Sequence, residues 1–232
     1  MKNFISLNKA KEQKVFSIFL FGASGIGKTE VARLIANGLQ SDCYLAKINF
    51  QNYSSQDALN SLIGSPAGYV GCNNGELSEK IQKSKVGVLL CDEFEKTTRP
   101  VFSFFLELLE EGQFTDSMAR EYDMDGYIII FTSNLLNEAD YKKAIPPELQ
   151  TRFDLVCEFE NPTMEEKIEF LDLLLEMAKS NYIEQFAEIE ITEDEKKQLY
   201  AFDYSSLSSL RDIKRVFNNR LMDFFCRKGI GQ

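Results

Sequence analysis

Histidine and tryptophan are both absent from this chain of 232 residues, and its five cysteines form no C-x-x-C pair. Without histidine, a Ser-His-Asp triad, a histidine general base and a histidine metal site are all excluded. The scattered cysteines argue against a structural zinc site or a disulfide framework and for a reducing compartment. We therefore expect a cytoplasmic protein. The cysteines are Cys43, Cys72, Cys91, Cys157 and Cys226.

Long apolar runs are also missing. No run reaches the roughly 18 residues that a membrane span requires, and the stretch from Met1 to Lys14 lacks the apolar region of a signal peptide. We therefore expect no membrane partner. The net charge of −10 disfavours nucleic acid as the main partner as well. The length is enough for one large α/β domain, or for one domain plus a small appendage.

Residues 22–29 form the most informative stretch, because Gly-Ala-Ser-Gly-Ile-Gly-Lys-Thr fits the phosphate-binding P-loop pattern G-x-x-x-x-G-K-[ST]. The apolar run 15–21 before it predicts a buried strand. The residues after it predict a helix, whose apolar face would comprise Val31, Leu34, Ile35 and Leu39. Strand, glycine-rich loop and helix are the context that the pattern requires. The alternative is a glycine-rich turn that fits by chance.

The chemistry of this loop follows from its backbone. Its glycines let the chain curl so that N–H groups point at phosphate oxygens, and the helix adds the positive end of its dipole. Lys28 can reach the β- and γ-phosphates, and the Thr29 hydroxyl can ligate Mg²⁺. The predicted nucleotide-binding residues are Gly22, Ala23, Ser24, Gly25, Ile26, Gly27, Lys28 and Thr29.

Polar residues follow two further apolar runs, 86–91 and 128–132, which predict central strands of a parallel sheet. Asp92 and Glu93 form a Walker B arrangement, in which the aspartate holds Mg²⁺ and the glutamate deprotonates the attacking water. Asn134 can hydrogen-bond the γ-phosphate and that water. A solvated acidic pair and an Asx turn are the alternatives.

The fold class follows from the alternation of strands and helices. Strands are also predicted at 44–50 and 155–159, and helices at 54–63, capped by Ser54 or Ser55, at 76–83 and at 101–109. The pattern predicts an α/β P-loop NTPase fold, a three-layer parallel sheet. Helices predicted at 164–178, 193–199 and 209–225 follow Pro162. We therefore expect a large nucleotide-binding domain at 1–161 and a small, mainly helical lid domain at 162–232.

Five further segments make a family resemblance specific: 62–71, 89–96, 109–116, 130–134 and 147–154. In this order they resemble the AAA+ ATPases, and within them the second ATPase module of the Clp unfoldases and disaggregases of the ClpA and ClpB type. The resemblance covers roughly residues 15–225. It implies an ATPase that uses ATP and Mg²⁺, forms a homo-oligomer, a hexamer by the family pattern, and remodels, unfolds or translocates a protein partner.

The resemblance also assigns roles to individual residues. Asn134 would be sensor 1. Arg152 would be the arginine finger that enters the nucleotide site of the neighbouring subunit, and Arg211 would be sensor 2, reaching the phosphates of its own subunit. Tyr69, followed by Val70, would be the pore-loop aromatic that grips a threaded polypeptide.

Each of these assignments has a plainer alternative. Arg152 could form a surface ion pair with Glu148 or Asp154, and Arg211 could be an ordinary solvated charge. Tyr69 could cap the edge of a core instead of facing a pore.

The chain departs from the Clp pattern in several places. Ser209 stands where the family usually has glycine, and the second pore segment, 115–120, reads Thr-Asp-Ser-Met-Ala-Arg instead of Thr-Asp-Gly-x-Gly-Arg. Residues 135–145 lack the long loop that docks Clp unfoldases on the ClpP peptidase. We therefore expect a stand-alone module with no ClpP-type partner, recruited by an encoded adaptor. A nucleotide-gated assembly component that threads nothing, and a nucleic-acid-linked AAA+ loader, remain as alternative functions.

Overall fold

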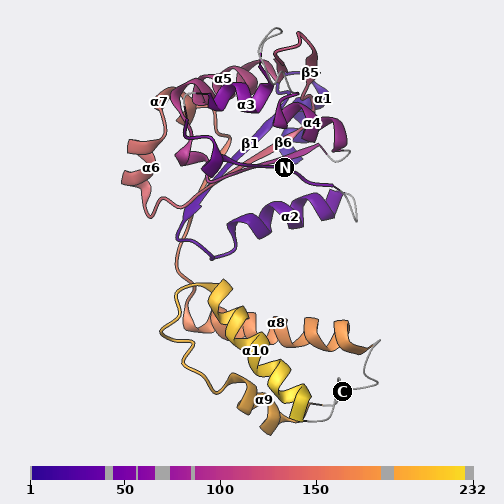
Figure 1. Cartoon of the computed structure of the whole chain (residues 1–232), viewed down its shortest axis with the longest axis vertical. Helices are drawn as coiled ribbons and strands as arrows, with labels where there is room; N and C mark the ends of the chain where they lie inside the picture. The colour runs from indigo at the N-terminus through magenta and orange to yellow at the C-terminus, as the bar shows by residue number, and fades with distance from the viewer. Residues whose placement is uncertain are drawn as a thin grey trace. The chain divides into compact units, whose positions relative to one another are not determined.

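The computed structural model describes residues 2–39, 44–55, 57–65, 74–84, 87–183 and 191–227 (Figure 1). Contacts between Cα atoms divide the chain into two compact units. The first comprises Met1–Gly22 and Lys28–Phe159, and the second comprises Ala23–Gly27 and Glu160–Gln232. The domain boundary predicted after residue 161 stays a prediction. No helix among the described residues is long and apolar enough to cross a membrane.

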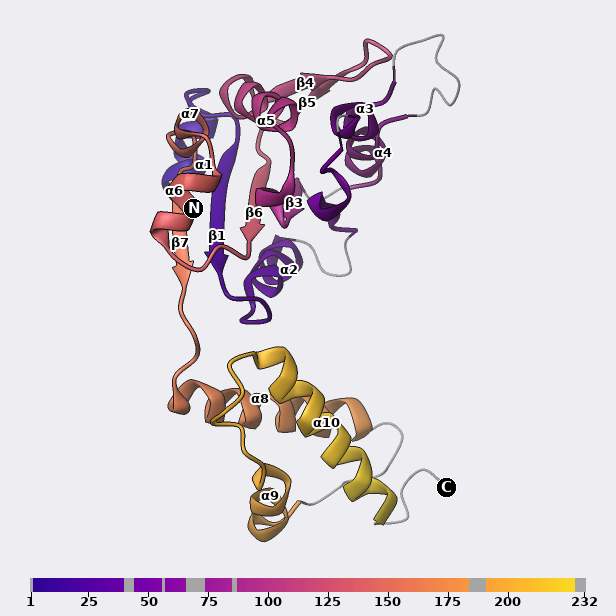
Figure 2. The ribbon, with the colours of Figure 1, turned by 60° about the vertical axis from the view of Figure 1, so that its left-hand side comes forward.

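A parallel sheet of five strands organises the described part of the first unit, in the order β2-β3-β6-β1-β7. The strand β1, which ends in the P-loop, pairs with β6 on one side and β7 on the other. Figure 2 shows β7, β1, β6 and β3 side by side with their arrows towards one edge. This sheet confirms the predicted α/β fold. The strands are β1 (Phe16–Gly22), β2 (Ala46–Asn49), β3 (Val88–Asp92), β6 (Ile128–Ser133) and β7 (Leu155–Phe159).

Helices cover both faces of the sheet. Successive residues of a strand point to opposite faces, so each strand contributes to two separate cores. Ile18 and Leu20 pack with α1 (Lys2–Lys9) and α2 (Lys28–Leu39), whereas Phe19 and Phe131 pack with the helices of the other face. Figure 1 shows α2 on one side of the sheet and α5 on the other. The remaining helices of this unit are α3 (Ala58–Ile63), α4 (Glu76–Lys83), α5 (Arg99–Glu111), α6 (Glu138–Ala144) and α7 (Pro147–Gln150).

Phenylalanine fills the core beneath α5. The rings of Phe94 and Phe131 lie 4.6 Å apart between centroids, and Phe105 meets Phe94 edge-on at 5.2 Å. All three side chains are fully buried. Since burying one phenylalanine contributes about 1.5–3 kcal/mol, this cluster stabilises the attachment of α5 and of the turn after β3 to the sheet.

The predicted apolar face of α2 is confirmed only in part. Val31 and Ile35 pack against the core beside the buried Ala32 and Ala36, whereas Leu34 and Leu39 are 63% and 52% exposed. The predicted cap of the next helix is wrong. Helix α3 begins at Ala58 after Asp57, so neither Ser54 nor Ser55 caps it. A short antiparallel hairpin, β4 (Gln113–Thr115) and β5 (Glu121–Asp123), lies outside the main sheet and was not predicted.

The second unit contains three helices among its described residues, α8 (Met164–Ile183), α9 (Glu193–Tyr200) and α10 (Leu210–Arg227). Leu171, Leu174 and Leu175 of α8 pack against Phe217 and Leu221 of α10 in a separate hydrophobic core. A capping box begins α9, since the Thr192 side chain accepts from Glu195 N and the Glu195 side chain accepts from Thr192 N. Ile168 of α8 lies outside this core and is 41% exposed.

Candidate nucleotide site

Lys28 lies at the carboxyl edge of the sheet, at the start of α2. It is 6% exposed, and its Nζ donates to the carbonyl of Gly22 at 2.8 Å and to Oδ1 of Asn134 at 3.3 Å. The second contact forms because β1 and β6 are paired with Phe21 opposite Ser133, which places Asn134 beside the end of β1. The structure thus brings the P-loop lysine and the predicted sensor 1 together.

The loop glycines adopt backbone conformations that favour glycine. Gly22, Gly25 and Gly27 have φ values of 143°, 80° and 108°, which side-chain-bearing residues rarely adopt. Gly25 belongs to the second unit, and within that unit the Arg211 backbone N–H donates to the Gly25 carbonyl at 3.2 Å. A Cβ added at Gly25 would lie 2.2 Å from Oγ of Ser209, so the serine side chain would have to move, and the φ of 80° itself disfavours other residues.

Asp92, the last residue of β3, collects three partners. Its Oδ1 accepts from Oγ1 of Thr29 at 3.5 Å and from Oγ1 of Thr132, and its Oδ2 pairs with Nζ of Lys47 at 2.5 Å. Burial raises the pKa of Asp92, but the hydrogen bonds from Lys47 and Thr132 and the charge of Lys47 outweigh it and hold the pKa below its ordinary value. The carboxylate is therefore charged at neutral pH.

Thr29 and Asp92 suit a magnesium ion. They offer a hydroxyl and a carboxylate in mutual contact, and Mg²⁺ prefers hard oxygen ligands and keeps several waters. No group of three or more acidic or cysteine side chains able to hold a metal occurs among the described residues. A single carboxylate with nucleotide phosphates suffices for Mg²⁺, so this result does not conflict with the fit.

Glu93 follows Asp92 in the left-handed region, with φ 57° and ψ 42°. For a residue with a side chain this conformation costs roughly 1–2 kcal/mol, and such strain is concentrated at functional sites. Its Oε1 accepts from Nδ2 of Asn134 at 3.3 Å, and its Oε2 pairs with Nζ of Lys96. A continuous series of hydrogen bonds therefore connects Lys28, at the start of α2, with Asn134 after β6 and Glu93 after β3.

Sequence reasoning missed several groups around this series. The Asn134 backbone N–H donates to Oε1 of Glu95 at 3.2 Å, while Oε2 of Glu95 is buried without a hydrogen-bond partner in the described part of the chain. The sequence marks Thr132 only as the last residue of a predicted strand, and no motif marks Lys47. The alternation of β2 is a signal that could have identified Lys47. The apolar Ala46 and Ile48 are buried, and the polar Lys47 and Asn49 between and after them are half-buried.

Arg152 lies at the opposite edge of the sheet. Oγ of Ser17 donates to the Arg152 carbonyl at 2.8 Å, and its guanidinium pairs with Glu110 of α5, not with Glu148 or Asp154. Ser17 lies near the start of β1 and Gly22 at its end, about 16 Å away at the usual rise of a strand. The backbone of Arg152 is therefore anchored far from the contact between Gly22 and Lys28.

Tyr69 and Val70 lie outside the described residues. The two chain segments that flank residues 66–73 meet at Gly64 and Asn74, which form an antiparallel bridge. Residues 115–120 are hydrogen-bonded to residues at this bridge. Ser117 N donates to the Ile63 carbonyl at 3.0 Å, and Nη2 of Arg120 donates to Oδ1 of Asn74 at 2.8 Å.

A buried carboxylate fixes the turn at residues 115–120. Asp116 accepts from the backbone N–H groups of Met118 and Arg120 at 2.9 and 3.0 Å, from Nε of Arg120 at 2.7 Å and from the Tyr122 hydroxyl at 3.1 Å. Ala119, where the Clp pattern has glycine, adopts a φ of 58°. The substitution therefore leaves the turn in place at the cost of a left-handed alanine.

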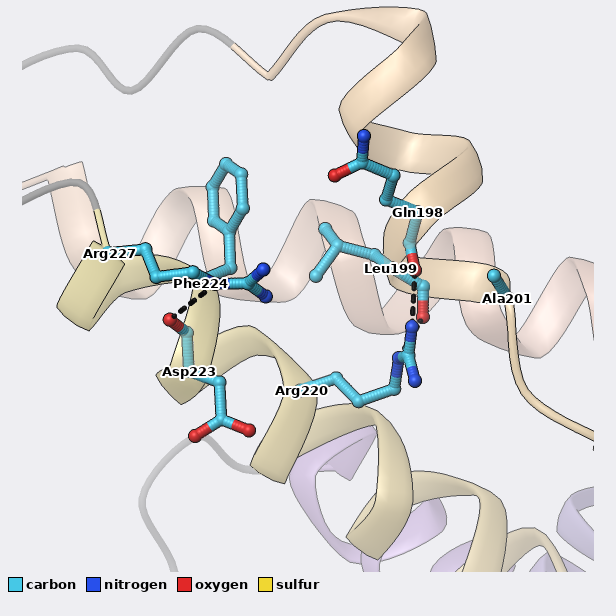
Figure 3. A pocket seen from close by; sticks show the side chains of 7 residues that line it. All are labelled: Gln198, Leu199, Ala201, Arg220, Asp223, Phe224 and Arg227. Carbon is cyan, nitrogen blue, oxygen red and sulfur yellow. Dashed lines mark hydrogen bonds between the residues drawn. The ribbon is translucent and has the colours of Figure 1, made fainter.

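Figure 3 shows a separate pocket of about 420 Å³ between α9 and α10. Arg220 donates to the carbonyls of Leu199 and Gln198, at 3.1 and 2.6 Å, and thereby caps the end of α9. No predicted site residue lines this pocket. Its lining residues are Gln198, Leu199, Ala201, Arg220, Asp223, Phe224 and Arg227.

The family model described as "AAA domain (Cdc48 subfamily)" matches residues 13–161, more than half of the chain. The chain belongs to the AAA family. Among curated proteins it is 30% identical to the chaperone protein ClpB of Staphylococcus epidermidis and 32% identical to that of Aquifex aeolicus. These matches cover 92% and 90% of this chain but 27% and 24% of the relatives. The chain thus spans about a quarter of their length.

A solved structure of similar fold is the closed-state cryo-EM reconstruction of Hsp104 with ATPγS and FITC casein. It matches with a TM-score of 0.81 and 24% identity, over 95% of this chain and 43% of that one. At this identity the match shows the fold alone. Together the comparisons confirm the predicted resemblance to the Clp-type AAA+ ATPases.

Proposed function

We propose that this chain is the ATP-hydrolysing subunit of a homo-oligomeric ring, of six subunits, that remodels, unfolds or translocates a protein partner. The observation that carries the proposal is the hydrogen-bonded series Lys28, Asn134 and Glu93, which lies beside the contact between Thr29 and Asp92. A phosphate-binding cation, a magnesium ligand pair and a carboxylate base are the groups that phosphoryl transfer to water requires.

Each residue has a separate part in this reaction. The backbone of residues 22–27 and the Lys28 ammonium bind the phosphates of ATP, and Thr29 and Asp92 hold Mg²⁺. The bound ion neutralises charge on the phosphate oxygens. Glu93 takes a proton from the attacking water, and Asn134 orients that water through its carboxamide. The contact between Asn134 and Glu93 supports this division of roles.

Arg152 and Arg211 complete the site in the proposal. Because the Arg152 backbone is anchored at the start of β1, Arg152 acts in the nucleotide site of a neighbouring subunit as the arginine finger. Arg211 acts as sensor 2. The similarity to the ClpB proteins, which covers most of the chain, supports that role.

The protein partner is proposed from two similar proteins. The similar ClpB proteins are named chaperones, and the similar Hsp104 reconstruction contains casein. We infer an encoded adaptor or substrate protein as the partner, in the cytoplasm, with neither nucleic acid, a membrane nor a ClpP-type peptidase. Tyr69 and Val70 would contact the threaded polypeptide.

A paired measurement on Tyr69→Ala tests the proposal. The two readouts are ATP turnover and the unfolding of a fluorescent reporter protein that carries an unstructured tag. Tyr44→Ala is the matched control, because Tyr44 is 47% exposed and belongs to no predicted site. Retained turnover with lost unfolding supports threading, since an aromatic side chain that grips peptide takes no part in phosphate chemistry.

The other outcomes favour the alternatives. Unchanged unfolding would favour a nucleotide-gated assembly component that threads nothing. Loss of both activities would mean that Tyr69 holds the ring together. If DNA stimulated ATP turnover of the parent, a nucleic-acid-linked loader would be favoured instead. A parent that hydrolyses no ATP at any protein concentration would overturn the proposal.

A further inference from the structure

Lys47 owes its position to the pairing of β2 with β3. Ala46 and Ile48 of β2 are fully buried, so Lys47 and Asn49 occupy the alternate, half-buried positions. The two strands run parallel with Asn49 opposite Asp92. This register places the Lys47 ammonium next to Oδ2 of Asp92, at 2.5 Å.

The backbone of Lys47 is held by a second lysine. Nζ of Lys80, on α4, donates to the Lys47 carbonyl and also pairs with Glu76. The Tyr53 hydroxyl donates to the same Glu76 carboxylate. Helix α4 therefore fixes the strand segment from which the Lys47 side chain extends, and the pair with Asp92 is not an isolated surface contact.

The two oxygens of Asp92 have different kinds of partner. Two threonine hydroxyls donate to Oδ1, and the Lys47 ammonium pairs with Oδ2. The side chains of Lys47 and Asp92 are 37% and 17% exposed, so solvent screens their attraction only in part. A divalent cation at Asp92 would meet the positive charge of Lys47 and would share the carboxylate with it.

We propose that Lys47 is a positioning residue that weakens the binding of Mg²⁺ at Asp92 and so sets the magnesium concentration at which the nucleotide site fills. The inference rests on the proposed function, because it takes Asp92 to be the magnesium ligand. It goes beyond that function by assigning a role to a residue that the nucleotide-binding motifs do not include.

Equilibrium binding of a fluorescent ATP analogue tests this role. Magnesium is titrated against a baseline in EDTA for the parent and for Lys47→Met, Lys47→Gln and Lys47→Arg. The two neutral variants should lower the half-saturating Mg²⁺ concentration about three- to tenfold, the effect of removing a partly shielded ion pair. Lys47→Arg keeps the charge and should stay within about twofold of the parent. Lys83→Met is the control, because its partner is Glu79 on the same helix.

The outcomes separate this inference from the proposed function. A half-saturating Mg²⁺ concentration that is unchanged or higher in folded Lys47→Met and Lys47→Gln overturns the inference. An increase would mean that Lys47 contacts the bound nucleotide. If the parent binds nucleotide without any dependence on Mg²⁺, the inference fails and nucleotide binding stands. If the parent binds no nucleotide, the proposed function fails and the inference fails with it.

Discussion

Asn134 donates from Nδ2 to Oε1 of Glu93 across 3.3 Å, so the residue after β6 contacts the residue after β3. The same carboxamide accepts from Lys28 through Oδ1 at 3.3 Å. One neutral side chain thus lies between the cation proposed to bind phosphate and the carboxylate proposed to activate water. A carboxamide suits this place because it can donate and accept at once.

Replacing Glu93 by Gln should separate nucleotide binding from hydrolysis. Glutamine keeps the shape of the side chain but cannot take a proton, and the loss of a general base typically lowers a rate about 10²–10⁴-fold. We expect normal ATP binding, a steep fall in turnover and accumulation of an ATP-bound oligomer. Phosphate release and size-exclusion chromatography measure these effects. Glu107→Gln on the exposed face of α5 is the control. Turnover at the parent rate would show that Glu93 is not the base.

The sheet and its functional edge could be predicted because both depend on local sequence patterns. Apolar runs mark β3 and β6, and the P-loop glycines mark the turn after β1. The contact of Lys47 with Asp92 could not be predicted, since it depends on the register between two strands that are distant in sequence. The hairpin of β4 and β5 was missed because strands of three residues are too short to show a periodicity.

Asp116 should stabilise the fold in a pH-dependent manner. Burial raises its pKa, but the hydrogen bonds from Arg120, Met118 and Tyr122 outweigh burial and hold the pKa below its ordinary value. Such a carboxyl stabilises the fold above the pKa of the unfolded chain, about 3.9, and the stabilisation is lost as the pH falls through the folded pKa.

Asp116→Asn should therefore lower the free energy of unfolding at pH 7 by about 1.5–3 kcal/mol, the contribution of a hydrogen bond to a charged group. The difference from the parent should be smaller at pH 3. Urea denaturation at both pH values measures it, with the exposed Glu121→Gln as the control. A difference of the same size at pH 3 and pH 7 would contradict the role of the charge.

The shortness of residues 135–145 predicts that no ClpP-type peptidase binds this protein. This segment holds α6, whose first turn is capped by Oδ1 of Asn137 accepting from Asp140 N at 2.9 Å. It provides no long docking loop. We expect that a ClpP-type peptidase neither co-elutes with this protein in the presence of ATP nor is stimulated by it. A Clp unfoldase that carries the docking loop is the positive control. Co-elution that depends on ATP would contradict the prediction.

The central claim is that a neighbouring copy completes the nucleotide site. Its most direct test is the ATP turnover of a mixture of two inactive variants. Arg152→Ala keeps an intact nucleotide site but lacks the finger, whose removal costs about 10³–10⁵-fold in GTPases. Lys28→Ala keeps the finger but not the phosphate-binding lysine. We predict that each variant alone is inactive and that the mixture regains part of the parent turnover, increasing with protein concentration. Two results together would contradict the account. The mixture would be as inactive as its components, and the specific activity of the parent would be the same when dilute and when concentrated.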